Sequence, residues 1–518
     1  MLTILNSEKY NQHLNAKKTG TRSENYELLL AILLFGSIGA IAWAIRGTAG
    51  WGGVDGTVVP GLMWGVLWYY LAYRKGIDAR GVVLWLGLGI ALGGELGYGQ
   101  YVSWIRGIFY VGAGTISVEP WIGYFWFIMC GIGWAAPGGI LLGWALGTRV
   151  STGRWIIRSI ILTVLLVLLF AWPFVDWLGE FLLKNNFTII FPNADLGIYS
   201  SELGEHLGRT IYTNTQNFAV VVWWIVALLE AAYHRDKTTL VIGLIIGGGF
   251  GFGFMQSAMW ALGYGLAPTY IDWWKLWELN SGFNLGILYA IALYWAVENM
   301  DKTEQPNSSA ISRTEVRTKL TEWRDTLFLA FGGFLLLFFV GFEYFFWTGL
   351  ALSLFYFIAM SLTTIGELDS ILIKERRKNI LLIYSVFFLV FIMFHGGSER
   401  LGIVFGLYSL DEVSQYSWPL KRILFFLPAA IVISGIAIFK MWNVLRPITE
   451  QNKLDLITSK QSMKIIDLMT IMGFIGVLSI WPAKISVFYA LFLVFAIFAF
   501  NRIEHRFDSI DTIKKYIS

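Results

Sequence analysis

Long apolar stretches separated by short polar segments occupy most of the chain. An apolar helix of about 20 residues spans the roughly 30 Å hydrocarbon core of a bilayer, and 14 stretches approach or exceed that length. The pattern therefore predicts an all-α polytopic membrane protein with about 14 transmembrane helices. The predicted spans are 26–45, 57–73, 81–104, 121–147, 155–175, 217–233, 239–262, 278–297, 326–342, 346–365, 380–395, 421–440, 467–481 and 485–500. The last two are short, and 12 spans remain if they form a re-entrant pair.

Composition supports the membrane class and limits the chemistry. Of 518 residues, 56% are hydrophobic and 14% are charged, and the mean hydropathy is +0.61. A single cysteine, Cys130, excludes an internal disulfide framework and a cysteine-based metal cluster, and no other pattern indicates a metal or a cofactor. The net charge of +4 comes from loop residues, so we expect the lipid bilayer as a partner and no nucleic acid.

The distribution of Lys and Arg predicts the orientation of the chain. With the N-terminus in the cytoplasm, the inner segments hold 30 of the 39 Lys and Arg residues, as the positive-inside rule requires. Residues 1–25 are polar and contain no apolar core, so we expect the first span to act as the insertion signal. The sequence thus predicts a multi-pass protein of the cell (inner or plasma) membrane with both termini cytoplasmic.

Two polar segments divide the chain further. An outer loop at about 176–216 is long enough to carry a lid or short interfacial helices, and an inner segment at 298–325 has the composition of a linker. The linker separates an eight-helix half from a six-helix half. The predicted regions are a cytoplasmic segment (1–25), the eight-helix membrane half (26–297), the cytoplasmic linker (298–325), the six-helix membrane half (326–500) and a cytoplasmic tail (501–518).

The eight-helix half contains a repeated glycine pattern. Glycines recur every fourth residue in the third span, and the same spacing returns 154 residues later in the seventh. Small residues at this spacing let helices approach closely in lipid. Both stretches run outward under the predicted topology, so we expect a parallel duplication of four helices, 26–147 and 155–297, although chance is a rival explanation in a chain with 55 glycines. The predicted packing glycines are Gly89, Gly93, Gly97, Gly243, Gly247 and Gly251.

Glu95 lies in the predicted third span, where a carboxyl must be paired, protonated or facing water. Its insertion cost of about 2.5–3.5 kcal/mol favours a functional role, with a fixed ion pair as the alternative. Arg46 ends the first span on the outer side and is the natural partner of Glu95. The second copy has Gly249 at the matching position, so a site at Glu95 would be asymmetric.

Other polar candidates share the outer half of the predicted bundle. Asp55 belongs to a glycine-rich segment after the first span, which suits a re-entrant turn or an ordinary hairpin. The remaining side chains can bind a ligand, although each can also bond a neighbouring helix or form a local ion pair. The predicted substrate or ion pathway comprises Arg46, Asp55, Glu95, Gln100, Arg106, Gln256, Glu278, Asn284, Glu399 and Arg400.

These residues leave two main function classes. A secondary transporter or flippase, with an outward-facing polar vestibule around Glu95 and Arg46, is favoured because repeats and an intramembrane acid are typical of transporters. The inner halves of the spans hold few charges, which counts against a simple ion-coupled carrier. The alternative is a membrane-embedded transferase acting on a lipid-linked or glycan substrate at the outer leaflet, with Asp55 or Glu95 as general base or metal ligand. A structural or assembly role is a third possibility, and no stretch identifies a family.

Overall fold

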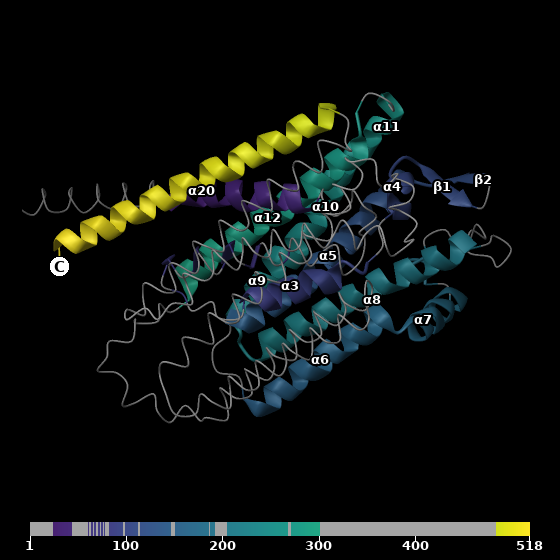
Figure 1. Ribbon diagram of the computed structural model, residues 1–518. Coiled ribbons are helices and arrows are strands. Elements are labelled where there is room, and N and C mark those ends of the chain that lie inside the picture. The colour runs from purple at the N-terminus through teal and green to yellow at the C-terminus, as the bar shows by residue number, and fades with distance from the viewer. Residues whose placement is uncertain are drawn as a thin grey trace, which may run out of the picture.

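The computed structural model consists of packed helices with a small β-hairpin at one end (Figure 1). The residues that it describes are 24–43, 61–77 in part, 82–96, 99–111, 114–146, 151–185, 187–191, 205–267, 271–300 and 483–517. The predicted linker and the predicted spans between 326 and 481 lie outside these residues, as do Arg46, Asp55, Glu399 and Arg400.

In chain order, the described elements are a first helix at Glu24–Trp43, helical residues between 61 and 74, α3 (Val82–Gly93), α4 (Gly99–Trp104), β1 (Ile108–Val111), β2 (Gly114–Ser117), α5 (Pro120–Leu146), α6 (Thr152–Phe170), α7 (Trp172–Lys184), α8 (Glu205–Tyr233), α9 (Lys237–Gly243), η3 (Leu244–Gly248), α10 (Gly249–Ala258), η4 (Met259–Leu262), α11 (Gly263–Leu266), α12 (Trp273–Asn299) and α20 (Ala483–Ile517). Elements α9 to α11 form one nearly continuous helical run, in which η3 is a π-helical turn.

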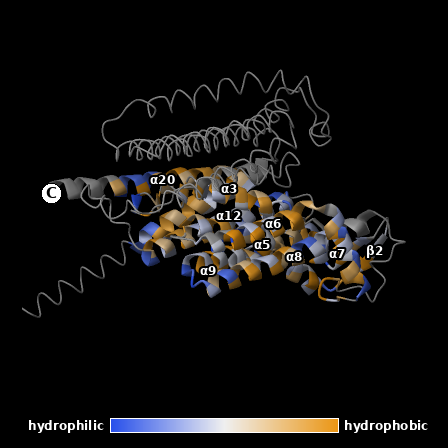
Figure 2. Cartoon of the chain, turned by 90° about the horizontal axis from the view of Figure 1, so that it is seen from below, coloured by the Kyte–Doolittle hydropathy of each residue, from blue (hydrophilic) through white to orange (hydrophobic). Residues whose placement is uncertain are grey.

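Several of these helices are long and apolar enough to cross a membrane. Within the described residues, four pass that test: Glu24–Trp43, Pro120–Leu146, Thr210–Tyr233 and Lys237–Leu266. The bent pair α6–α7 adds a fifth if it counts as one span. Hydrophobic residues run along the helices, and many hydrophilic residues gather toward their ends (Figure 2). A helical, membrane-embedded protein is thus supported, while the count of 14 spans and the four-helix duplication stay predictions.

Helix α5 lies at the centre of the described bundle and contacts α3, α8, α9 and α10 (Figure 1). Glycines make these contacts close. A Cβ added at Gly93 of α3 would lie 1.9 Å from the carbonyl oxygen of Trp134 in α5, and one added at Gly251 of α10 would lie 3.0 Å from that of Ile128. Both glycine stripes therefore meet the same helix. Of the other predicted packing glycines, Gly89 faces α5, Gly243 and Gly247 lie between α5 and α8, and Gly97 is outside the described residues.

The predicted third span, 81–104, is not one helix. Helix α3 ends at Gly93, residues 94–96 form a turn, and α4 begins at Gly99. Two consecutive glycines at 93 and 94 weaken the helix at this point, and the indole N–H of Trp134 donates to the carbonyl of Leu96 at 2.9 Å, which satisfies a group that the break frees. The expectation that Glu95 lies inside a membrane-spanning helix is therefore wrong, because Glu95 lies in the turn.

The all-α prediction also misses a hairpin. Strands β1 and β2 pair antiparallel, with Ile108 opposite Ser117 and Val111 opposite Gly114. The sequence Ile-Phe-Tyr-Val before a Gly-Ala-Gly turn has the β-branched and aromatic residues and the short glycine-containing connection typical of a hairpin. The hairpin joins α4 to α5 at one end of the bundle, which we call the hairpin end.

Glu27 in the first helix contacts several elements at the end of the bundle opposite the hairpin. We call this end the Glu27 end. Its buried carboxylate pairs with Lys75 and accepts a hydrogen bond of 2.8 Å from Tyr294 of α12. Nε of Arg506 in α20 lies 3.3 Å from the second carboxylate oxygen. Helix α20 is continuous to Ile517, so the predicted tail extends the last helix. The start of the first helix, the end of α12 and the second half of α20 share one end of the bundle, as the predicted alternation of spans requires.

Candidate functional site

Helix α8 carries a buried polar stretch at the hairpin end. The stretch begins at Thr210, where the membrane-length segment of α8 begins, and the prediction places all of it except Asn217 in the outer loop. Buried polar groups need hydrogen-bond partners, so the contacts of this stretch show what it can do. The buried polar side chains, each with at most 4% of their surface exposed, are Thr210, Thr213, Asn214, Thr215, Gln216 and Asn217.

Tyr101 of α4 is the main partner of this stretch. Its fully buried hydroxyl donates to Oδ1 of Asn214 at 2.9 Å and accepts from Nδ2 of Asn217 at 3.1 Å. The ring of Tyr101 stacks on Trp126 of α5, with ring centroids 5.9 Å apart. The phenol is thus held between two amides and against an aromatic ring, which links α4, α5 and α8. We call Tyr101, Tyr212, Asn214, Gln216 and Asn217 the α8 polar cluster.

Backbone carbonyls outside α8 hold the cluster in place. Nδ2 of Asn214 donates to the carbonyl of Ile190 at 2.9 Å, and Nε2 of Gln216 donates to the carbonyl of Leu169 at 3.1 Å. Gln216 also contacts the hydroxyl of Tyr212 at 3.3 Å. These bonds tie α8 to the end of α6 and to the segment 187–191, so the polar side chains have fixed orientations.

Glu95 lies beside the α8 polar cluster. Its side chain is half-buried. A Cβ added at Gly133 of α5 would lie 2.5 Å from the side chain of Leu96 and 3.4 Å from Oδ1 of Asn217, so the turn after α3 abuts α8. An acid, two phenols and three amides thus gather where α3 is broken.

The depth of the cluster follows from the length of α8. Asn217 and Thr210 precede Glu230, near the other end of α8, by 13 and 20 residues. At 1.5 Å per residue, these separations are about 20 and 30 Å. The cluster therefore lies in the last third, nearest the hairpin end, of a stretch of α8 about as long as the hydrocarbon core is thick.

A second polar contact, between α10 and α12, brings two predicted site residues together. Nδ2 of Asn284 donates to Oε1 of Gln256 at 2.7 Å and to the carbonyl of Gly253 at 2.8 Å. Asn280 donates to Asn284 at 3.1 Å and accepts from the indole of Trp260 at 3.0 Å. Amide pairs of this kind link transmembrane helices, so these contacts account for both residues without a ligand.

Arg106 and Glu278 also lie at the hairpin end. The guanidinium of Arg106 lies 5.6 Å from the centre of the Tyr264 ring. Glu278 is buried and accepts from Nζ of Lys275 at 2.6 Å and from the indole of Trp274 at 2.9 Å. Glu278 thus forms a local ion pair within the first turns of α12, one of the readings that the sequence left open. Gln100 belongs to α4, but its side chain is not among the described ones.

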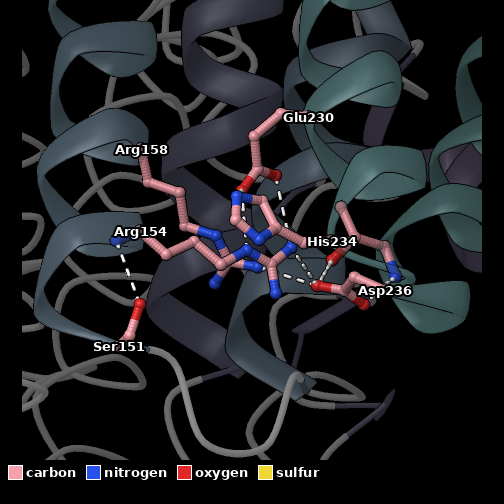
Figure 3. A network of polar contacts seen from close by, with 7 residues as sticks. Ser151, Arg154, Arg158, Glu230, His234 and Asp236 are labelled. Carbon is pink, nitrogen blue, oxygen red and sulfur yellow. Dashed lines mark hydrogen bonds and ion pairs between the residues drawn. The ribbon is translucent and has the colours of Figure 1, made fainter.

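A network of charged side chains joins α6, α8 and the start of α9 at the Glu27 end, and Figure 3 shows its contacts. Arg154 of α6 contacts Glu230 of α8 through Nε at 2.6 Å and reaches Asp236 at 2.8 Å. Asp236 also accepts from Arg158 at 2.8 Å and caps α9 by accepting from the backbone N–H of Thr239 at 3.0 Å. The Arg158 side chain is fully buried, with its guanidinium 5.2 Å from the Trp144 ring. We call Arg154, Arg158, Glu230, His234 and Asp236 the Arg154 network.

The Arg154 network was not among the predicted site residues. The sequence placed its two arginines in an inner loop as topological charges, yet they lie in the first two turns of α6. Two positive and two negative side chains balance one another, which allows their burial. In the part of the chain that the structure describes, no three His, Cys, Asp or Glu side chains lie together as a metal site needs.

The α8 polar cluster was missed as well, although its signal is in the sequence. Residues 210–217 read Thr-Ile-Tyr-Thr-Asn-Thr-Gln-Asn, and a hydropathy window assigns such a stretch to a loop.

Compared with known proteins, the chain matches no family model, no curated protein and no solved structure. The candidate site is therefore defined by its own geometry: Glu95 and the α8 polar cluster toward the hairpin end, and the Arg154 network at the Glu27 end.

Proposed function

We propose that the protein is a secondary transporter or flippase with a polar vestibule around Glu95 and Arg46 that opens at the hairpin end. The observation that carries this proposal is the buried polar stretch of α8 beside the broken helix α3–α4, toward the hairpin end of a bundle with membrane-length helices. Polar side chains at that depth are costly and mark substrate or ion pathways. The Lys and Arg distribution favours an extracytoplasmic hairpin end.

The interruption of α3 supports the same proposal. Transporters bind substrates where transmembrane helices are discontinuous, at matching places in their repeats. With the offset of 154 residues, the turn at 94–96 corresponds to 248–250, and the π-helical turn η3 ends at Gly248. The two departures from regular α-helix are therefore adjacent in the predicted copies and share the position of Gly94 and Gly248, and only the first carries an acid, Glu95.

The apolar middle of α8 explains how the pathway would be gated. Between the α8 polar cluster and Glu230, buried residues such as Val220, Trp223 and Ala227 separate the two polar regions. The Arg154 network closes the Glu27 end below them. We therefore assign this conformation to an outward-facing or occluded state, in which opening toward the cytoplasm requires the network to separate.

Transport can be measured before the substrate is known. Proteoliposomes with an imposed Na⁺ or H⁺ gradient would be incubated with a mixture of amino acids, sugars and nucleosides, and the accumulated solutes would be identified by mass spectrometry. A second set would contain fluorescent phospholipid, whose movement between leaflets is measured by dithionite quenching. We expect one of the two activities in the wild type and a loss of at least tenfold in Glu95→Gln.

The matched control is Glu180→Gln, which removes an exposed carboxylate of α7 and should leave the activity unchanged. Equal activity of Glu95→Gln and the wild type would exclude Glu95 from the pathway. Absence of both activities from the folded wild-type protein would exclude these transport functions. The transferase alternative depends on Asp55 or Glu95, and in the described part of the chain no observation favours it over transport.

A further inference from the structure

Helix α7 presents an aromatic face that no described residue covers. Phe174, Trp177 and Phe181 are 40%, 58% and 50% exposed. Their rings follow one another along the helix, with centroids 5.9 Å apart in both successive pairs. At about 100° per residue these three side chains fall within roughly 60° of one another. An aromatic stripe of this size is unusual on a water-exposed helix.

The rest of α7 divides into two further faces. Val175 and Leu182 are buried, and a Cβ added at Gly179 would lie 2.8 Å from Ile211 of α8. Asp176 and Glu180 are exposed and lie on a third side, about 100° or more from Phe181. One face therefore packs on protein, one is acidic, and one is aromatic.

The length of α6 fixes the depth at which α7 begins. Helix α6 has 19 residues from Thr152 to Phe170, or about 28 Å at 1.5 Å per residue, which is close to the thickness of the hydrocarbon core. By length α6 can cross the membrane without α7, although by length and apolar composition only the bent pair α6–α7 together qualifies as a span. Segments 156–170 and 173–184 meet at 80°, so α7 runs nearly parallel to the membrane plane if α6 runs across it.

Helix α8 gives the same depth independently. Gly179 of α7 packs against Ile211, and Ile211 precedes Glu230 by 19 residues, again about 28 Å. Figure 1 places α7 and the β-hairpin at the same end of the bundle. Both neighbours of α7 therefore place it at the membrane boundary of the hairpin end.

We propose that α7 is an interfacial helix whose aromatic face binds the boundary between headgroups and acyl chains of the leaflet at the hairpin end. Trp and Phe rings on one side with acidic residues toward water are suited to this boundary. The exposed apolar side chains Ile160, Val164 and Val167 of α6 continue the same lipid-facing surface below it.

Lipid contact at α7 bears on the candidate site because α7 also touches it. A Cβ added at Gly179 would lie 2.9 Å from the hydroxyl of Thr215, which belongs to the buried polar stretch of α8 between Asn214 and Gln216 of the cluster. The proposed interfacial helix thus forms a wall between the leaflet and the cluster. Its position depends on the membrane and not on the function proposed above.

Spin labelling tests the inference in the whole protein. Cys130 is the single cysteine, so Cys130→Ala provides a background in which Phe181→Cys, Glu180→Cys and Leu182→Cys each carry one nitroxide. These three neighbouring positions sample the aromatic, acidic and buried faces. Collision rates with O₂, which concentrates in lipid, and with a water-soluble nickel chelate would be measured in phosphatidylcholine–phosphatidylglycerol vesicles.

We expect the label at 181 to collide several-fold more with O₂ than with the nickel chelate, the label at 180 to show the reverse, and the label at 182 to be accessible to neither. Preferential nickel collision at 181 would overturn the inference and make α7 a water-exposed lid. Protection of 181 from both reagents would also overturn it, because another protein surface would then cover the aromatic face.

Discussion

Replacing Asp236 by asparagine removes one negative charge from the Arg154 network and leaves the shape of the side chain almost unchanged. Asp236 accepts from both Arg154 and Arg158 at 2.8 Å. Arg154 keeps Glu230 in the variant, whereas the fully buried Arg158 loses its carboxylate partner. Breaking a buried pair on one side costs about 3–5 kcal/mol, so we expect about 3 kcal/mol, near the lower end, for Asp236→Asn.

Two further variants separate the charge from the helix cap. Asparagine can still cap α9, whereas Asp236→Ala also loses the bonds to the backbone N–H and the hydroxyl of Thr239, which adds about 1 kcal/mol. Combining Asp236→Asn with Arg158→Met removes both charges and should recover most of the loss, because the buried guanidinium that Asp236→Asn leaves uncompensated is then gone.

The measurement is the free energy of unfolding in mixed micelles, titrated with dodecyl sulfate and followed by circular dichroism. Glu180→Gln, on the exposed face of α7, is the control and should stay within about 0.5 kcal/mol of the wild type. If Asp236→Asn also stayed within that range, the buried charges would not stabilise the closed Glu27 end. Failure of the double variant to recover would show that the charge balance is not what matters.

The remaining predictions concern packing, the cluster and the C-terminal helix. Gly93→Ala should lower the free energy of unfolding by at least about 1–3 kcal/mol, because the added Cβ would lie 1.9 Å from a carbonyl oxygen of α5. The control is Gly153→Ala, whose Cβ would meet nothing within 4 Å and which should be close to neutral. Both variants are compared with the wild type by dodecyl sulfate titration. Tyr101→Phe removes two hydrogen bonds and should cost about 1–3 kcal/mol in the same titration, and an unchanged midpoint would contradict the role of the phenol. Glu27→Gln should release α20 and increase trypsin cleavage after Arg506, while equal cleavage would show that this contact does not hold the helix.

Hydropathy and charge alternation were enough to predict a helical membrane bundle, since burial of backbone groups in lipid leaves few other solutions. The helices at Glu24–Trp43, α5 and α12 lie close to the predicted spans. The break after Gly93 could not be predicted in this way, because it depends on a carbonyl and an indole of α5 that are distant in sequence.

The candidate site was only partly accessible from the sequence. Glu95 was identified because a charge inside an apolar window is conspicuous, but its neighbours in α8 were assigned to a loop because they are polar. Burial of Asn214 and Asn217 depends on Tyr101, more than 100 residues away, and no periodicity in the sequence reveals that pairing. Gln256 and Asn284 were each predicted as site residues, and the structure brings them into contact, which the sequence did not predict.

The accessibility of the α8 polar cluster tests the central claim most directly. In the Cys130→Ala background, Thr213→Cys places a thiol one turn from Asn217, and Ser257→Cys places one in the buried contact between α10 and α12 as a control. Oriented vesicles would be treated from each side with a membrane-impermeant methanethiosulfonate. A polar vestibule predicts that the thiol at 213 reacts from the hairpin side, at least tenfold faster than the thiol at 257. Equal protection of both thiols would contradict the account and make the cluster a sealed element of helix packing.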